Sequence, residues 1–237
     1  MTTRSRYESG ILTFFDDIAN YERVAPVAPV VFYDDFLKNA IDVGWTSIDV
    51  SAGGNTTPIQ AGAANGVARL PLDVTSEAQE SGLTWGDKRS LVLNQGLIFE
   101  CRVALQTLPT LLGIAVWGVA GNKNAVADTV AESAWFRVDG NGVVTVETDD
   151  TVHEQTTIAT GTTLTAGLFA TFRIDCRTIT DVQFFINGAR VAAATTFNMS
   201  QVAGLLLQPY FHIAKASGAG LGVVDVDFCR AWMRRAA

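Results

Sequence analysis

The stretch from residue 31 to residue 237 is a succession of short apolar or alternating segments separated by turn residues, and this pattern limits the fold most strongly. In the segment 97–105, Phe99 and Cys101 fall on one face of an extended chain and Glu100 on the other, which is the period of a half-buried strand. About a dozen such segments, with no helical stretch longer than a turn or two, predict an all-β sandwich or barrel. The predicted strands are 30–36, 66–72, 90–93, 97–105, 112–118, 134–138, 143–148, 171–176, 182–186, 190–193, 205–214, 222–228 and 229–233.

The connections between these strands carry their own signals. Asn187-Gly188 lies between two apolar runs and predicts a hairpin with a type I′ turn, because both central residues of that turn need a positive φ. The alternation changes at Phe228-Cys229, as it does at a β-bulge. The segments 118–133 and 149–166 are rich in Gly, Ala, Thr and Asp and are predicted to be long surface loops.

Residues 1–30 differ from the rest and are interpreted as an N-terminal arm that precedes a sandwich domain over residues 31–237. Apolar spacings of three and four predict a short amphipathic helix, and Pro26 and Pro29 then favour an extended strap. This apolar patch is too small to form a core, so we expect it to pack on its own domain or on a neighbouring partner. The predicted partner-binding residues are Tyr7, Ile11, Leu12, Phe14, Phe15, Ile18 and Tyr21.

The charge balance argues against nucleic-acid binding. The net charge is −7, and the short basic run at the C-terminus, with Arg230, Arg234 and Arg235, does not supply the clustered cations that phosphate neutralisation needs. Charged residues make up only 17% of the chain, below the usual quarter or so. Two interpretations stay open: a surface partly covered by partners, or a thick sandwich core.

The N-terminal residues, the apolar runs and the cysteines indicate the compartment of the protein and the redox state of its thiols. No secretory signal follows Met1, and no apolar run has the length of a membrane span, so neither secretion nor a membrane is expected. Cys101, Cys176 and Cys229 are odd in number and far apart, which fits buried thiols in a reducing compartment better than a disulfide framework.

Candidate catalytic carboxylates are few. Asp225 and Asp227 stand two apart on one face of a predicted strand, but they lack a third acid, and solvent-facing or edge aspartates are the interpretation we favour. Glu147, Asp149 and Asp150 lie where a hairpin ends and are expected to be solvated.

Metal and cofactor chemistry has equally little support. His153 and His212 are the only histidines, and neither forms a ligand pair at metal-binding spacing. Asp139-Gly140-Asn141-Gly142 lacks the further acids of a calcium loop and is interpreted as a hairpin turn. We therefore predict no metal and no cofactor.

The late hairpin carries a family resemblance. Phe172-Arg173-Ile174, a spacer and the run Phe184–Val191 resemble the late hairpin of concanavalin A-like lectin/glucanase jelly rolls. The segments Asp34-Asp35-Phe36 and Val224–Phe228 resemble the strands that open and close such domains. The resemblance covers about residues 31–233 and implies an antiparallel two-sheet jelly-roll sandwich. Glucanases of this fold carry a Glu-x-Asp-x-x-Glu motif, which this chain lacks, so the implied protein is not an enzyme.

The run Ala134–Gly142 resembles virion structural proteins of tailed bacteriophages. That resemblance implies a capsid decoration protein, made in the host cytoplasm and located on the virion, which stabilises the capsid surface by arm-mediated bridging of subunits. The implied partners are the major capsid protein or other virion proteins, and the implied oligomer is a dimer or trimer of this chain.

Two alternatives remain open. One is a carbohydrate-binding or receptor-binding module of a phage tail or fibre, for which Trp45 and Trp85 are the loop-side candidates to stack on a sugar. Each of these residues also fits a tryptophan at the rim of the core, which is the commoner role. The other alternative is an unrecognised glycosidase or lyase.

Overall fold

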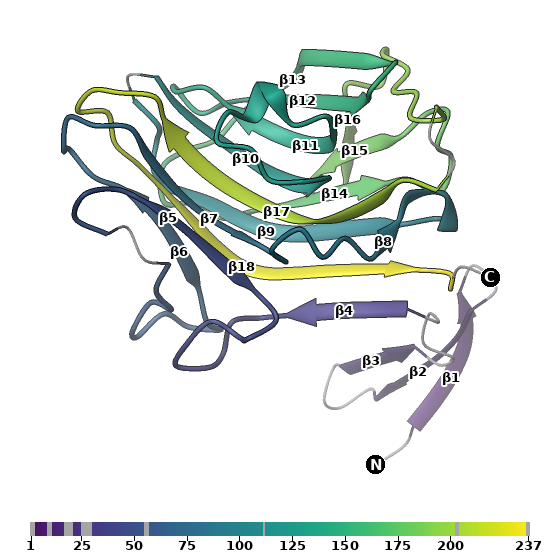
Figure 1. Cartoon of the computed structure of the whole chain (residues 1–237). Helices are drawn as coiled ribbons and strands as arrows, with labels where there is room; N and C mark the ends of the chain where they lie inside the picture. The colour runs from purple at the N-terminus through teal and green to yellow at the C-terminus, as the bar shows by residue number, and fades with distance from the viewer. Residues whose placement is uncertain are drawn as a thin grey trace.

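The computed structural model describes residues 3–8, 11–16, 21–24, 30–54, 57–110, 112–201 and 204–235. In this part of the chain two antiparallel sheets pack face to face, with β17 and β10 in one layer and β9 and β18 in the other (Figure 1). The prediction of an all-β, two-sheet jelly-roll sandwich is confirmed.

The first layer is a sheet of eight described strands in the order β13-β12-β11-β10-β17-β7-β5, with β8 added beside β17. Each neighbouring pair runs antiparallel. The strands are β5 (Thr46–Val50), β7 (Gln79–Thr84), β8 (Leu91–Val92), β10 (Gly113–Ala120), β11 (Glu132–Val138), β12 (Val143–Asp150), β13 (Glu154–Thr163) and β17 (Leu206–Lys215).

The second layer is a sheet of seven described strands in the order β16-β15-β14-β9-β18-β4, with β6 added beside β18. A short 3₁₀ turn, η1 (Leu93–Gln95), precedes β9. The strands are β4 (Val30–Asp34), β6 (Ala68–Leu72), β9 (Ile98–Thr107), β14 (Ala170–Asp175), β15 (Gln183–Ile186), β16 (Ala189–Val191) and β18 (Gly222–Met233).

The core lies between the sheets because alternate residues of each strand point there. Phe136 stands at its centre and meets the rings of Phe172 and Phe184 edge to face, at centroid distances of 4.9 and 5.3 Å. Trp117 packs on the same cluster and is fully buried. The three cysteines are free and lie in this core, as expected, and burial raises the pKa of each thiol.

The predicted hairpin and bulge are both confirmed. Asn187 and Gly188 have φ of 49° and 80°, the positive values of a type I′ turn, between β15 and β16. The pairing of β18 with β9 shifts register between Val226 and Phe228. The two strands predicted at the C-terminus are therefore one strand with a bulge.

Three strands of the two-sheet sandwich are absent from the prediction. β5 and β7 form one edge of the eight-stranded sheet and β13 forms the other. β7 reads Gln-Glu-Ser-Gly-Leu-Thr and β13 is rich in threonine, so neither shows the apolar alternation of a half-buried strand. The prediction of a surface loop over 149–166 is therefore wrong where β13 runs.

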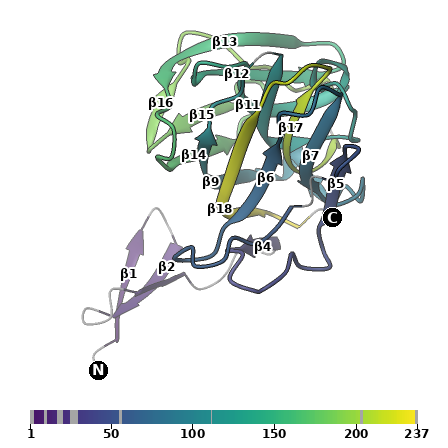
Figure 2. The ribbon, with the colours of Figure 1, turned by 90° about the vertical axis from the view of Figure 1, so that its left-hand side faces the viewer.

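The helix predicted in the N-terminal arm is also wrong. The described residues there form a three-stranded antiparallel sheet of β1 (Thr3–Glu8), β2 (Ile11–Asp16) and β3 (Tyr21–Val24), labelled in Figure 1, with β1 and β2 also labelled in Figure 2. Aromatic and β-branched residues favour strands, and the spacing of three and four arose from separate short strands. Ile18 and the proline strap at 25–29 lie outside the described residues.

Candidate functional site

The outer face of the eight-stranded sheet, directed away from the core, carries an aromatic pair at its centre. Cross-strand pairing sets Trp135 of β11 and Tyr210 of β17 on either side of Gly118 of β10. The two ring centroids lie 5.7 Å apart. A Cβ on Gly118 would come within 2.4 Å of the Ala134 carbonyl oxygen, so only glycine fits between these strands.

A connection between β10 and β11 lies across this aromatic pair. We call residues 121–131 the crossing segment; it contains the 3₁₀ turn η2 (Ala127–Thr129), the short coil above the sheet in Figure 1. Ala127 and Val130 of the crossing segment pack against Trp135 and Tyr210, and Trp135 is only 1% exposed. The predicted surface loop over 118–133 is thus partly buried on the sheet.

Polar side chains of β17 fix the first part of the crossing segment. Gln208 donates from Nε2 to the Gly121 carbonyl at 2.7 Å and to Asp87 Oδ1 at 2.8 Å, and its Oε1 accepts from the Asp87 backbone N–H at 3.2 Å. The Tyr210 hydroxyl donates to the Asn124 carbonyl at 3.2 Å. The crossing segment is therefore held by buried and partly buried hydrogen bonds, and it separates two pockets on the outer face.

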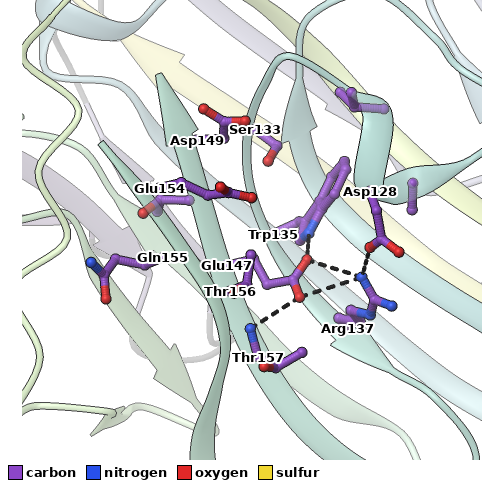
Figure 3. Close-up of a pocket in the computed structure, with 13 residues that line it drawn as sticks. Asp128, Ser133, Trp135, Arg137, Glu147, Asp149, Glu154, Gln155, Thr156 and Thr157 are labelled. Carbon is purple, nitrogen blue, oxygen red and sulfur yellow. Dashed lines mark hydrogen bonds and ion pairs between the residues drawn. The ribbon is translucent and has the colours of Figure 1, made fainter. Parts of the chain in front are cut away.

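Pocket one lies between the crossing segment and β13 and has a volume of about 250 Å³ (Figure 3). Its walls come from the crossing segment and from β11, β12 and β13. Most of its lining residues are polar, and they include exposed side chains of β13. The lining residues are Ala127, Asp128, Val130, Ser133, Trp135, Arg137, Glu147, Thr148, Asp149, Glu154, Gln155, Thr156 and Thr157.

The floor of pocket one is organised around Glu147. Its Oε2 accepts from the Trp135 indole N–H at 2.8 Å, and its Oε1 accepts from the Thr157 backbone N–H at 3.1 Å. Arg137 Nη1 lies 3.4 Å from the same carboxylate (Figure 3). Glu147 is only 5% exposed, so its lone pairs are committed to holding the floor together.

Arg137 is the cation of pocket one and is held by three acids. Its Nε donates to Asp139 at 2.7 Å, its Nη1 contacts Asp128 of the crossing segment, and Glu147 lies beneath it. Burial alone would lower the pKa of this guanidinium, but the hydrogen bonds to Asp139 and Asp128 and the charge of Glu147 raise it. Arg137 is thus a fixed cation whose charge is already neutralised.

Further acids leave pocket one with an excess of negative charge. Asp149 and Glu154 face each other across β12 and β13 and both line the pocket. Burial raises the pKa of Asp149, assisted by the charge of Asp150 and opposed by a hydrogen bond from the Thr151 backbone. Such a wall offers acceptors to hydroxyl groups and repels anions.

Pocket two lies on the other side of the crossing segment and has a volume of about 230 Å³. Glu80 of β7 and His212 of β17 lie in its lining, with Glu80 Oε2 3.2 Å from His212 Nε2 and 2.7 Å from Lys123 Nζ. The hydrogen bond with His212, and then that with Lys123, lower the pKa of Glu80 to about 2 against the opposing effect of burial. Glu80 is therefore a carboxylate throughout the neutral range.

The tryptophans predicted as glycan-binding candidates lie elsewhere. Trp45 is 7% exposed, donates from Nε1 to Asp34 Oδ2 at 2.7 Å and packs on Phe32, so it has no ring face to offer a sugar. Trp85 is half-buried and meets the same Phe32 edge to face, at a centroid distance of 4.9 Å. Neither lines pocket one or pocket two.

The acids predicted to be solvated are mostly buried. Asp225 is bidentate to Arg69 at 2.7 Å, and Asp227 contacts Arg102, so both pair with cations of neighbouring strands. Asp150 is fully buried and accepts the backbone N–H groups of residues 152, 153 and 201. Sequence cannot show Arg69, Arg102 or residue 201 as partners because each lies far along the chain from its acid.

Sequence reasoning missed the residues that form the outer face. Gln208, Tyr210 and His212 alternate along β17, and this polar alternation inside an apolar run was the available signal. Trp135 and Arg137 alternate in the same way on β11. Within the described ranges, no group of His, Cys, Asp and Glu is placed to hold a metal ion, and no helix has the length and apolarity to cross a membrane.

Comparison with solved structures supports the fold. The carbohydrate recognition domain of Emp47p is similar to this chain with a TM-score of 0.56 and 9% identity, over 86% of this chain and 95% of that one. A β-1,3-glucanase from Mycobacterium marinum matches with a TM-score of 0.55 and 17% identity, over 85% and 97%. A family 7 alginate lyase in complex with product matches with a TM-score of 0.52 and 11% identity, over 77% and 92%.

No family model matches the chain, and no curated protein matches it in sequence. The strand order and these structural likenesses define the domain as a concanavalin A-like jelly roll. At such low identity the likeness concerns the fold, and function is argued from the site.

Proposed function

We propose that this domain is a non-enzymatic carbohydrate-binding module that holds a saccharide chain on the outer face of its eight-stranded sheet. The observation that carries the proposal is pocket one, where exposed polar side chains of β13 stand beside a rigid floor. Glu154, Gln155 and Thr156 supply acceptors and donors in the mixture that sugar hydroxyls require. The solved structures with this fold include a carbohydrate recognition domain, a glucanase and an alginate lyase, which is consistent with such a role.

The charge of pocket one selects among saccharides. Asp128, Asp149 and Glu154 line it, and Arg137 is already paired, so a uronic acid or sulfated sugar would meet net repulsion. A neutral polysaccharide is therefore the proposed ligand class.

The floor of pocket one also favours binding over catalysis. Retaining glycoside cleavage needs two carboxyl groups that can reach the same glycosidic bond, one of them free to donate a proton. Glu147 is buried and committed to Trp135, Thr157 and Arg137. The sequence-based hypothesis of a capsid decoration protein stays a prediction, and the pocket and the fold favour its carbohydrate-binding alternative.

A pull-down with insoluble polysaccharides tests this function. We expect the chain to bind a neutral β-glucan or chitin and not an acidic polymer such as alginate. The double variant Glu154→Ala/Gln155→Ala should weaken binding, and Thr163→Ala, at the exposed end of the same strand, should not. Failure to bind any neutral polysaccharide would overturn the proposal, as would equal binding by the double variant.

A further inference from the structure

Pocket two differs from pocket one in chemistry, and this difference points to a second subsite. We infer that pocket two accepts the acetamido group of an N-acetylated amino sugar, with its methyl group among alanines and its N–H on Glu80. The inference rests on the proposed carbohydrate-binding function and names a substrate class for it. The two pockets share Ala127 as a wall, so one saccharide chain that passes over the crossing segment can reach both.

The walls of pocket two are small and apolar. Its space exists because short side chains line it, where leucine or phenylalanine would fill it. The larger apolar surfaces come from Val50, Leu112, Ile114 and Val126. The short side chains are Ala78, Ala125, Ala127, Ala214 and Ala216. An acyl methyl group gains from burial on such a surface, and a sugar hydroxyl does not.

The polar end of pocket two is an ionised carboxylate with acceptor capacity to spare. His212 Nε2 and Lys123 Nζ both contact Oε2 of Glu80. These contacts leave Oε1 available, and the Glu80 side chain is 12% exposed. A carboxylate has about four lone-pair sites, so Oε1 can accept an N–H from a ligand.

The same groups discriminate between an amide and an ammonium. Lys123 already balances the charge of Glu80, so a second cation gains little there and would lose hydration against the alanines. Lys215, which lines the pocket, donates its Nζ protons to the carbonyls of Asp73, Thr75 and Gly220 and is not free to bind a ligand. An acetamido group therefore matches the carboxylate acceptor and the apolar wall together, whereas an amine or a hydroxyl lacks the methyl group that the wall would bury.

Titration calorimetry with three oligosaccharides tests the inference: an N-acetylglucosamine oligomer, its deacetylated counterpart and a glucose oligomer of equal length. We expect the acetylated oligomer to bind roughly tenfold tighter than either of the others, the discrimination typical of a small apolar group in a fitted pocket. Ala214→Leu and Ala78→Leu should remove that preference by filling pocket two. Ala189→Leu, on exposed β16 in the other sheet, is the matched control and should keep it.

The outcomes separate this inference from the proposed function. Ala78 is exposed, so its leucine variant should fold even if Ala214→Leu repacks the sheet, and thermal unfolding of both checks this. Equal affinity for the three oligomers, or a preference that survives both leucine variants, overturns the acetamido subsite while carbohydrate binding stands. Binding of none of the three overturns the function itself and the subsite with it.

Discussion

The carboxylate of Glu80 and the imidazole of His212 face each other at 3.2 Å on adjacent strands of the outer face, although 132 residues separate them in sequence. Lys123 of the crossing segment meets the same carboxylate oxygen at 2.7 Å. This three-membered contact ties β7, β17 and the crossing segment together beneath pocket two. The ionisation of Glu80 therefore affects both the stability of the sheet and the ligand proposed for the pocket.

The first prediction concerns pH. The pKa of Glu80 falls from an ordinary 4.5 to about 2 on folding, so the stabilisation is fully present above pH 4.5 and is lost as the pH falls through 2. It amounts to about 3 kcal/mol. Glu80→Gln should lower the free energy of unfolding at pH 7 and flatten its decline between pH 4.5 and 2. Urea unfolding across this range measures both, and an unchanged slope in the variant would contradict the prediction.

The second prediction concerns the aromatic pair over β10. Gly118→Ala places a Cβ within 2.4 Å of the Ala134 carbonyl oxygen and 2.7 Å of the Trp135 Cα, both backbone atoms that cannot move aside cheaply. We expect a loss of about 2 kcal/mol or more in the free energy of unfolding. The control is Gly53→Ala, where nothing lies within 4 Å of the added Cβ. Comparable losses in the two variants would show that the close approach at Gly118 is not the cause.

The third prediction concerns the support of the crossing segment. Gln208→Ala leaves the Gly121 carbonyl and Asp87 without their buried partner, which should cost about 3 kcal/mol. Amide hydrogen exchange should accelerate in residues 121–126 more than in β9, because the anchor lies at that end. Gln201→Ala, at an exposed position, is the matched control. Uniform acceleration through the whole domain would argue for global destabilisation instead.

The fourth prediction concerns Asp225, one of the two aspartates considered as candidate catalytic residues. Asp225→Ala leaves Arg69 unpaired on β6, so we expect the domain to lose about 3 kcal/mol of stability. Saccharide affinity should stay within twofold or so of the parent at a temperature where both are folded, because Asp225 lies on the other sheet. A large loss of affinity in the folded variant would contradict the assignment of the binding site to the eight-stranded sheet.

Sequence reasoning succeeded where strands bury one apolar face or turn on a glycine. β9, β15 and β18 show the alternation of period two, and Asn187-Gly188 specifies its own turn, so these features are local. Strand β7 was not predicted because its buried polar side chains are stabilised by residues far along the chain. Glu80 needs Lys123 and His212, and no local sequence pattern indicates them. β13 failed because a largely exposed edge strand can be polar on both faces.

The site was harder to predict than the fold, for a related reason. The predicted sugar-binding tryptophans lie in loops. Trp135, by contrast, lies in the middle of β11 under the crossing segment, and its hydrogen-bond partner Glu147 comes from the next strand. Polar residues at alternate positions of an apolar strand, such as Gln208 and His212 on β17, would have been the better guide. Such residues face away from the core and must be hydrogen-bonded if they are buried.

The shared wall of the two pockets has a consequence for how this domain can change. Ala127 belongs to the crossing segment and lies outside the strands of both sheets, yet it lines both pockets. A lengthened, shortened or substituted turn at this point would reshape both pockets at once while the hydrogen-bonded strands beneath stay intact. In the binding mode proposed above, ligand preference is thus set by a turn and not by the sheets, and new specificities can be sought by randomising that turn on an otherwise constant scaffold.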